Sequence, residues 1–405
     1  MKTSLLVFTV LVLGSSGCNL FSKTAAPTPT PNKPPVISTG KVLETSKPTE
    51  TAFQLYRLLA ANPANVNLSP LSLKIAFSLI YPGTAGDTQK LYEQIFGFTE
   101  GTTNPFHAEY ELAAKTEKLK SDTNQLVIEN SAWMKSTKGV KDEFVESLKT
   151  QNAEIGKLSL DAINEWVASA THNKIPKLLS SLDPGTKAIF INAIYFKQKW
   201  LAPFDAKLTS TDQFQTSPYA SSHVPTMHTE KEVQYFEDKT SKWVGLSYAD
   251  SPFEILFALP AKRFDLRAIE DTLSMSQITN LLGQMKPVQV QLSIPKFKFN
   301  EMASFKALLK NAGYGELFSQ SDYSGISTPS PVLSDVIQAA SIEVNESGTE
   351  ASAATGAIML RNLRVKEPIF EKSFIADEPF IFVLLNKDTK EIYWLGRVYQ
   401  PLLNK

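Results

Sequence analysis

Few side chains in this sequence have types suited to catalysis or metal binding. Four histidines and one cysteine occur among 405 residues: His107, His172, His223, His228 and Cys18. His223 and His228 lie five positions apart in HVPTMH, which is not the HExxH order of a zinc hydrolase. Neither a GxSxG nucleophile elbow nor a GxxxxGKS/T phosphate loop occurs. The sequence therefore predicts no catalytic residue, no metal site and no cofactor, and we expect the protein not to be an enzyme.

A run of small residues near the C-terminal end is the most unusual stretch. From Ser347 to Ala357 the sequence reads SGTEASAATGA, with one charge and otherwise nothing larger than threonine. In an extended chain alternate side chains share a face, so Glu350 lies on one face. The other face carries no charge, and its members are Thr349, Ala351, Ala353, Thr355, Ala357 and Met359.

Taken alone, such a run is typical of a flexible linker or of a poor helix. Its position favours another interpretation, because it follows VLSDVIQAASIEV (332–344), which has the composition of a buried strand. No proline occurs between Val332 and Pro368, so every backbone N–H of the run is available for a sheet. We therefore expect an exposed loop that can be added later to a sheet as a strand.

Cys18 stands in a context typical of a secretion signal. Lys2 precedes an apolar run, LLVFTVLVL (5–13), which is too short to span a bilayer, and small residues follow at 14–17. A cysteine at this place resembles the lipoprotein signal of bacteria, in which residues 1–17 would be removed and the Cys18 thiol lipidated. Ser15 departs from that pattern, which usually has leucine. Ordinary secretion with an incidental cysteine is the alternative.

Residues 18–48 are polar and rich in proline, as in TAAPTPTPNKPP. Such a segment cannot bury enough apolar surface to fold, and an extended chain of about 3 Å per residue would reach roughly 90 Å. We expect this disordered tether and the lipid on Cys18 to hold a folded domain away from a membrane. The expected location is a membrane-anchored lipoprotein, secreted across the inner membrane and either periplasmic or on the cell surface.

Residues 49–405 contain no second linker, charge block or internal repeat, so we expect one domain. Apolar residues recur at three and four positions and predict helices at 51–62, 71–81 and 162–179. Short segments rich in β-branched and aromatic residues predict strands at 188–196, 253–260, 288–299, 379–386 and 391–398. Because helices and strands segregate along the chain, the expected class is α+β with antiparallel sheets.

Several motifs along residues 49–405 resemble, in order, those of the serpin family. NESGTEASAAT (345–355) resembles the serpin hinge, EEGTEAAAAT. INAIYFKQKWLAPF (191–204) resembles NAIYFKGxWxxxF, and INEWVASATHNKI (163–175) resembles INxWVxxxTxxKI. The remaining similar segments are NVNLSPLSLKIAFSLIYPGTAGDT, IPKFKF, GYGELFSQSDYSGIS, ADEPFIF and YWLGRVYQP.

The resemblance implies a serpin fold with three mainly antiparallel β-sheets, eight to nine helices and an exposed reactive-centre loop at about 346–372. In this family a protease cuts the loop and is trapped as an acyl-enzyme when the cut loop inserts into the central sheet. Small uncharged side chains add little cost to that insertion, so we expect an inhibitor. Matched residue by residue, the hinge comprises Glu346, Gly348, Thr349, Glu350, Ala351, Ser352, Ala353, Ala354 and Thr355.

The resemblance also places the bond that the protease cuts. In inhibitory serpins the residue before this bond usually lies 16 positions after the hinge glutamate, which gives Asn362, and Arg361 is the shorter variant. A basic residue fits the acidic specificity pocket of trypsin-like enzymes. We therefore expect cleavage at Arg361–Asn362 by a trypsin-like serine protease, with a cysteine protease as the other possible target. Asn362–Leu363 and Arg364–Val365 are the alternative bonds.

Five more residues match positions that govern sheet opening in serpins. Ser69, Ser72 and Asn192 resemble the polar group beneath the central sheet that must separate, and Trp200 resembles the aromatic residue where insertion begins. Ordinary core packing is the alternative, and it is compatible with this role. Gln338 stands where the family commonly has histidine, and glutamine cannot titrate near pH 6.5.

A second hypothesis belongs to a different functional class. The chain could be a non-inhibitory serpin-fold lipoprotein, a binding or structural protein that proteases cut without being trapped. Under both hypotheses we expect a monomer that meets the membrane only through its N-terminal lipid. Nucleic acid is not an expected partner, because 41 basic and 41 acidic residues give a formal net charge of zero.

Overall fold

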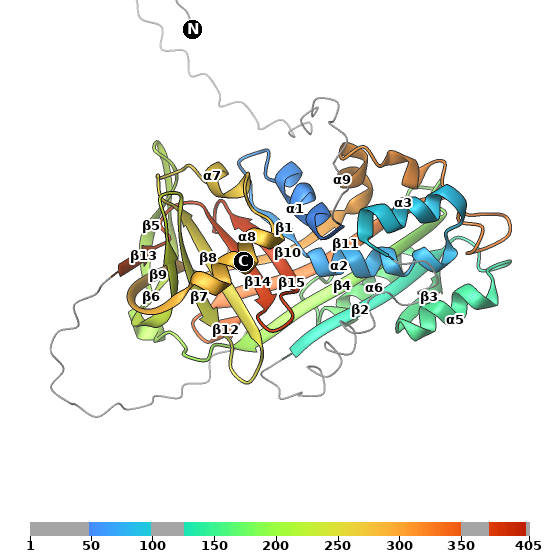
Figure 1. Ribbon diagram of the computed structural model, residues 1–405. Helices are drawn as coiled ribbons and strands as arrows, with labels where there is room; N and C mark the ends of the chain where they lie inside the picture. Colours follow the sequence, from blue (N-terminus) through green and yellow to red (C-terminus); the bar gives the residue numbers. More distant parts are fainter. Residues whose placement is uncertain (1–47, 99–124, 350–371, 402–405) are drawn as a thin grey trace, which may run out of the picture. The chain divides into compact units, whose positions relative to one another are not determined.

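Two β-sheets with helices around them form the described part of the protein, in a computed structural model that describes residues 48–98, 125–349 and 372–401 (Figure 1). All of these residues belong to one unit. The expected signal segment and residues 18–47 of the expected tether lie outside the described residues, whereas Pro48, the last residue of the expected tether, begins the first described helix. Within the described ranges, no helix is both long enough and apolar enough to cross a membrane.

The first sheet has six strands in the order β10-β11-β12-β4-β2-β3. Its middle strands are buried on both faces, which explains why β4 reads as an almost continuous apolar run. The predicted strand at 332–344 is confirmed as β11. The bounds are β2 (Gln125–Met134), β3 (Ala153–Lys157), β4 (Ala188–Lys199), β10 (Phe297–Ser304), β11 (Leu333–Asn345) and β12 (Gly348–Thr349).

The second sheet has nine strands and contains the remaining predicted strands of the C-terminal half. The predicted segment 288–299 is divided between its strand β9 and β10 of the other sheet. The bounds are β1 (Val66–Leu68), β5 (Ser210–Ser217), β6 (Ala220–Glu237), β7 (Ser241–Ser247), β8 (Phe253–Pro260), β9 (Lys286–Pro295), β13 (Lys372–Ile375), β14 (Phe380–Asn386) and β15 (Ile392–Val398).

The described residues thus form two hydrogen-bonded sheets where three were expected, because the long strand β6 joins two of the expected sheets. β6 pairs with β5 and β9 over most of its length, and its last four residues, Gln234–Glu237, pair with β7. Most pairings are antiparallel, as expected; the parallel ones are β4 with β11, β2 with β3, and β9 with β13.

Eight α-helices lie within the described ranges, in agreement with the expected eight to nine. Ser69 and Ser159 cap the starts of α2 and α6 with their side-chain oxygens. The helix predicted at 162–179 ends earlier, since His172 has positive φ. The bounds are α1 (Pro48–Leu59), α2 (Pro70–Ser78), α3 (Gly86–Phe96), α5 (Asp142–Thr150), α6 (Leu160–Ala170), α7 (Arg267–Glu270), α8 (Met275–Gln284) and α9 (Phe305–Asn311).

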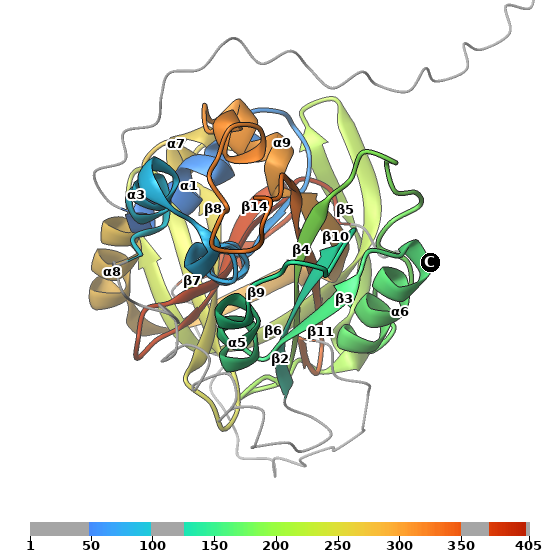
Figure 2. The same cartoon turned by 90° about the vertical axis from the view of Figure 1, so that its right-hand side faces the viewer.

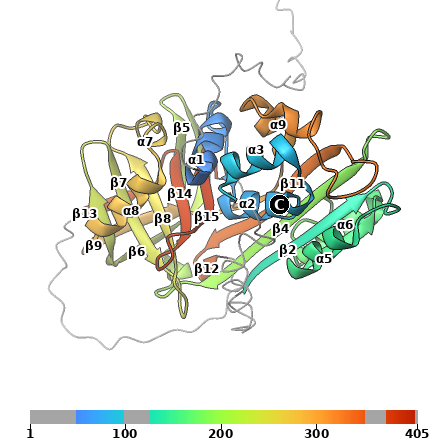
Figure 3. The same cartoon turned by 45° about the vertical axis from the view of Figure 1, so that its right-hand side comes forward.

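Helices cover the six-stranded sheet on both sides. α6 packs against β2 and β4 on one face of the sheet (Figure 2). On the opposite face α5 packs against β3, with Phe144 against Phe190 of β4, and α2 contacts β4, β11 and β15, so α2 lies where the two sheets meet (Figure 3). Alternate residues of β4 accordingly enter different cores: Ile191 packs beneath α6, whereas Phe196 packs against the nine-stranded sheet.

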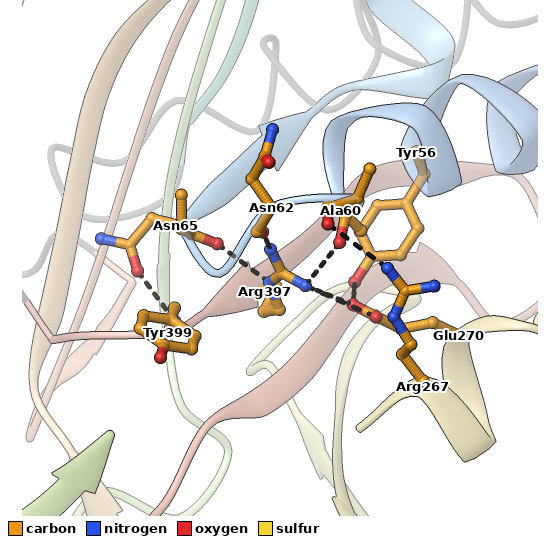
Figure 4. A network of polar contacts seen from close by, with 10 residues as sticks. Tyr56, Ala60, Asn62, Asn65, Arg267, Glu270, Arg397 and Tyr399 are labelled. Atoms are coloured by element: carbon orange, nitrogen blue, oxygen red, sulfur yellow. Dashed lines mark hydrogen bonds and ion pairs between the residues drawn. The ribbon is translucent and has the colours of Figure 1, made fainter. Parts of the chain in front are cut away.

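A buried ion pair joins the first helix to the last strand (Figure 4). Arg397 of β15 donates to Glu270 of α7 at 3.1 Å, and the hydroxyl of Tyr56 in α1 donates to the same carboxylate at 3.0 Å. The Arg397 guanidinium also donates to the backbone oxygens of Ala60, Asn62 and Ala64, which follow α1. Although burial raises the pKa of Glu270, the nearby Arg397 favours its charged form. The network fixes α1 to the C-terminal strands.

Candidate functional site

The seam between β4 and β11 adjoins the start of the residues matched to the hinge. The two strands pair in parallel from Leu333 with Ala188 to Ser341 with Tyr195. Gln338 and Asn192 are direct partners in this register. Two residues proposed from the sequence for sheet opening therefore face each other across the seam.

A buried polar cluster lies beneath this seam, and it contains Ser69, Ser72, Asn130, Asn192 and Gln338. The Gln338 Oε1 atom accepts from the Ser69 amide at 2.9 Å, and the Ser69 hydroxyl accepts from the Ser72 amide at 3.0 Å. The Ser72 hydroxyl donates to Asn192 Oδ1, while Asn192 Nδ2 donates to Asn130 Oδ1 at 2.8 Å. Each side chain is at most 1% exposed. The cluster thus connects α2, β2, β4 and β11 through neutral hydrogen bonds.

Sequence reasoning missed Asn130. The sequence did contain a signal for this residue. Asn130 is a polar residue within β2 and is followed by SAWM, so it is expected to lie at an edge or to have a buried hydrogen-bonding partner. Its register opposite Asn192 supplies that partner.

β12 shows that the start of the hinge already lies within the sheet. Gly348 and Thr349 stand between β4 and β11 at the end of the seam, antiparallel to both (Figure 3). Thr349 is fully buried, and its hydroxyl lies 2.6 Å from that of Tyr248. We expected the whole run to be an exposed loop, and these two residues correct that expectation. Their small size permits it, because β4 and β11 separate here by the width of one strand.

Close backbone approach explains the glycine in this strand. A Cβ atom on Gly348 would lie 2.0 Å from the backbone oxygen of Gln198. We expect Gly348→Ala to displace β12, so that the Thr349 amide exchanges hydrogen faster, as measured by mass spectrometry. Gly283→Ala is the matched control, because no atom lies within 4 Å of its added methyl group. Unchanged exchange at Thr349 in the first variant would contradict the tight fit.

Trp200 holds the backbone just before the inserted residues. Its indole Nε1 donates to the Asn345 oxygen at 2.8 Å, and its amide donates to the Ser347 oxygen at 3.1 Å. Its ring stacks on Tyr248 at a centroid distance of 4.6 Å, and Tyr248 is the partner of Thr349. The structure therefore places Trp200 at the end of the seam, beside the first residues matched to the hinge.

Glu346 forms a second attachment of the hinge. Its carboxylate lies 2.9 Å from Lys296 Nζ and accepts from the Thr209 hydroxyl at 2.8 Å. Burial alone would raise the pKa of this carboxyl, but the hydrogen bonds from Lys296, the Glu346 backbone and Thr209 outweigh it, so the pKa is lowered. Both partners come from elements distant in sequence, and periodicity could not have identified them.

A lowered pKa makes the Glu346 attachment dependent on pH in a defined direction. The carboxylate stabilises the folded protein above its unfolded pKa of about 4.3, and this stabilisation is lost as pH falls through the lower folded value. We expect Glu346→Gln to melt at a lower temperature than the parent at pH 7, and the two melting temperatures to converge below about pH 4. A difference that stays constant across this range would contradict the assignment.

Several residues proposed from the sequence lie outside the described residues. They are Cys18, the hinge positions Glu350, Ala351, Ser352, Ala353, Ala354 and Thr355, and the candidate cleavage residues Arg361, Asn362, Leu363, Arg364 and Val365. The described ends of the segment are Thr349 and Lys372, in β12 and β13.

The histidines of the described ranges have packing or surface roles. His228 lies 2.9 Å from the Ser293 hydroxyl and 3.0 Å from Asp212, and these contacts join β5, β6 and β9. His172 packs against the Tyr195 ring. No group of three or more histidine, cysteine or acidic residues within the described part of the chain is placed to hold a metal ion.

Comparison with known proteins agrees with this architecture. The family model for serpins, described as serine protease inhibitors, matches residues 46–401. The chain belongs to the serpin family. It is 29% identical to an uncharacterised serpin-like protein of Thermococcus kodakarensis, over 99% of both chains. It is 31% identical to a leukocyte elastase inhibitor of Xenopus laevis, covering 87% of this chain and 98% of that protein.

The fold is also similar to that of solved serpin structures. A crystal structure of human thyroxine-binding globulin with its ligand superposes with a TM-score of 0.78 at 24% sequence identity, covering 89% of this chain and 98% of that one. Serpins are generally protease inhibitors and not catalysts, and the proteins similar to this chain include an elastase inhibitor and a thyroxine-binding globulin.

Proposed function

We propose that this protein inhibits a trypsin-like serine protease by acting as a suicide substrate. The protease would cut the loop between β12 and β13 and form an acyl-enzyme. The cut loop would then insert between β4 and β11 and carry the protease with it. The observation that supports this proposal most directly is β12, because two hinge residues already occupy the place that an inserted strand would extend.

The register of β12 determines which loop residues would meet which strands. Thr349 pairs with Gln198 on β4 and with Val344 on β11, and both pairings are antiparallel. Moving two residues forward along the loop therefore moves two residues back along each strand. Continued in this way, the register places Ala353 (349 + 4) between Ile194 (198 − 4) and Ala340 (344 − 4).

Two positions after Ala353, the same register brings the hydroxyl of one loop residue to the polar cluster. Thr355 (349 + 6) would stand between Asn192 (198 − 6) and Gln338 (344 − 6), which pair directly in the uncut protein. Its side chain would lie on the face that Thr349 uses, where the cluster is buried. The side-chain amides of Asn192 and Gln338 now bond to Ser72, Asn130 and the Ser69 amide, and the inserted hydroxyl would offer them a further partner as the seam opens.

Insertion also has an entropic cost, which must be exceeded by the free energy gained when the loop enters the sheet. Ordering about 15 residues costs roughly 15–30 kcal/mol. New ladder hydrogen bonds and apolar burial must exceed that cost, and a charged or bulky inward side chain would subtract from them. The inward positions after Thr349 are Ala351, Ala353 and Thr355, which are small and uncharged.

The target follows from the residues near the expected cut. Arg361 offers a basic side chain to an acidic specificity pocket, which favours trypsin-like enzymes and cleavage at Arg361–Asn362. Incubation with trypsin is expected to give a complex at the summed mass that survives boiling in SDS. Mass spectrometry of the released peptide identifies the bond. Cleavage without any such complex would instead support the binding or structural role for this chain.

The same proposal includes anchoring of the domain through Cys18 and the proline-rich tether. The support is the order of a charged start, a short apolar core and small residues before the cysteine. In a bacterial host, we expect the parent to fractionate with membranes and Cys18→Ser to lose the lipid mass measured on the N-terminal peptide. An unmodified Cys18 in the parent would contradict the anchor and leave the inhibitor proposal intact.

A further inference from the structure

A cavity of about 190 Å³ lies beside Trp200, where β6 and β7 stop pairing. The two strands pair as far as Gln234 with Gly245, and beyond this pair they diverge. The backbone that follows β4, from Trp200 to Ala202, forms another wall. Apolar cavities of about 150 Å³ hold a benzene ring, so this cavity has room for a ligand with a single ring.

Lys231 supplies the cavity with a positive charge. Its Nζ atom donates to the Ala202 oxygen at 2.8 Å and lies 4.4 Å from the centroid of the Phe204 ring. An ammonium group has three donors, and only one is used by this hydrogen bond. Among the described residues, no carboxylate oxygen lies within 4.0 Å of Nζ. A partly buried ammonium without an anionic partner is suited to bind an anion.

Burial of Lys231 has a measurable electrostatic consequence. It lowers the pKa of the ammonium to about 8, so the group is still mainly protonated at neutral pH. An anion bound beside it would compensate for the lost hydration. Glu232 is the carboxylate among the lining residues, and it is exposed, whereas Lys231 is half-buried.

The other walls are divided between apolar and polar side chains. Trp200, Leu246 and Pro287 provide apolar surface, and Gln234 and Ser247 provide hydrogen-bonding groups. A ring would have apolar walls to pack against, and a carboxylate would have one cation to pair with. The lining therefore favours an amphipathic anion over a wholly apolar ligand.

We propose that this cavity is a binding site for a small carboxylic acid with a single ring, whose carboxylate pairs with Lys231 while its ring packs between Trp200 and Leu246. The site lies outside the seam and outside the reactive loop. Trp200 nevertheless belongs to both places, because its indole Nε1 holds the Asn345 oxygen just before the hinge. A ligand packed against its ring would hold the start of the hinge in its present position.

Calorimetric titration of the uncut full-length protein with benzoate tests the site. Benzyl alcohol has the same ring without the charge, and we expect benzoate to bind at least about tenfold more tightly. Lys231→Met should remove this preference and leave the affinity for benzyl alcohol unchanged. Lys207→Met is the matched control, since Lys207 is exposed and does not line the cavity. Equal affinities for the two ligands, or a folded Lys231→Met protein that binds benzoate as the parent does, would overturn the proposal.

A second variant tests the location without removing the charge. Ser247→Leu fills the cavity and should weaken both benzoate and benzyl alcohol by at least about tenfold. If both still bind as in the parent, the ligand lies elsewhere and the proposal fails. Circular dichroism of both variants shows whether they are folded, and the Ser247→Leu protein supplies the test if Lys231→Met does not fold.

An effect of the ligand on inhibition rests on the proposed function. Benzoate at saturation is expected to slow formation of the trypsin complex, because it would restrain Trp200, whose indole holds the Asn345 oxygen just before the hinge. Binding is measured without protease, so a failure to inhibit trypsin and a failure to bind benzoate are separate results. Saturating benzoate that leaves the rate unchanged would overturn the coupling to the hinge.

Discussion

Under the proposed function, replacing Thr349 by arginine is expected to convert the protein from an inhibitor of its protease into a substrate. Thr349 is fully buried between β4 and β11, and its hydroxyl contacts Tyr248. A guanidinium at this place would have no anionic partner, and burying it would cost about 3 kcal/mol or more. We expect the arginine to leave the sheet in the uncut protein, so that burying it again during insertion slows this step about a hundredfold and the acyl-enzyme hydrolyses before it is trapped.

The matched control is Glu350→Arg, which places the same side chain one residue later on the face opposite to Thr349. We expect this variant to retain most of its complex formation with trypsin. The measurement is the ratio of SDS-stable complex to cleaved protein on a gel, together with the second-order rate of inhibition. If both variants inhibit equally well, the inward face does not control insertion and the proposed mechanism is wrong.

The second large effect is expected on stability when Arg397 is replaced by methionine. This change leaves the buried Glu270 without its cation and removes the donor to the backbone oxygens of Ala60, Asn62 and Ala64 (Figure 4). Breaking a buried pair by removing one partner costs about 3–5 kcal/mol. A urea titration of the uncut protein should therefore show a markedly lower midpoint.

Two controls accompany this prediction. Lys149→Met removes a pair with Glu146 in which both side chains are about two-thirds exposed, and it should leave the midpoint almost unchanged. The double variant Arg397→Met and Glu270→Met removes both buried charges and should be more stable than Arg397→Met alone. A double variant less stable than the single one would show that the loss of the Tyr56 contact with Glu270 outweighs the removal of the unpaired charge.

The sequence alone predicted much of the arrangement along the seam. The composition of 332–344 predicted a buried strand and that of 188–196 predicted a strand, and the structure confirms them as β11 and β4. The match to serpin motifs identified Ser69, Ser72, Asn192 and Gln338, and the structure brings these four side chains together. In these cases the chemical type of the residue and its local pattern contained enough information.

Other features depended on contacts between distant parts of the chain. The partners of Glu346 lie on segments 50 and 137 residues away, and no local pattern joins them. β6 became a bridge between expected sheets because of its length and register, which are set by the strands on either side. The position of Thr349 inside the sheet depends on how far β4 and β11 separate at their ends, and this separation is a property of the folded protein.

The position of β12 also affects the order of events after cleavage. Forming the first hydrogen-bonded pairs of a new strand is the least favourable step in free energy, because chain entropy is lost before neighbouring contacts form. In this protein the pairs of β12 are already formed in the uncut chain. The cut loop would therefore only have to extend β12. The fate of the enzyme would then depend on two competing first-order rates, elongation and deacylation, and this chain controls the first of them.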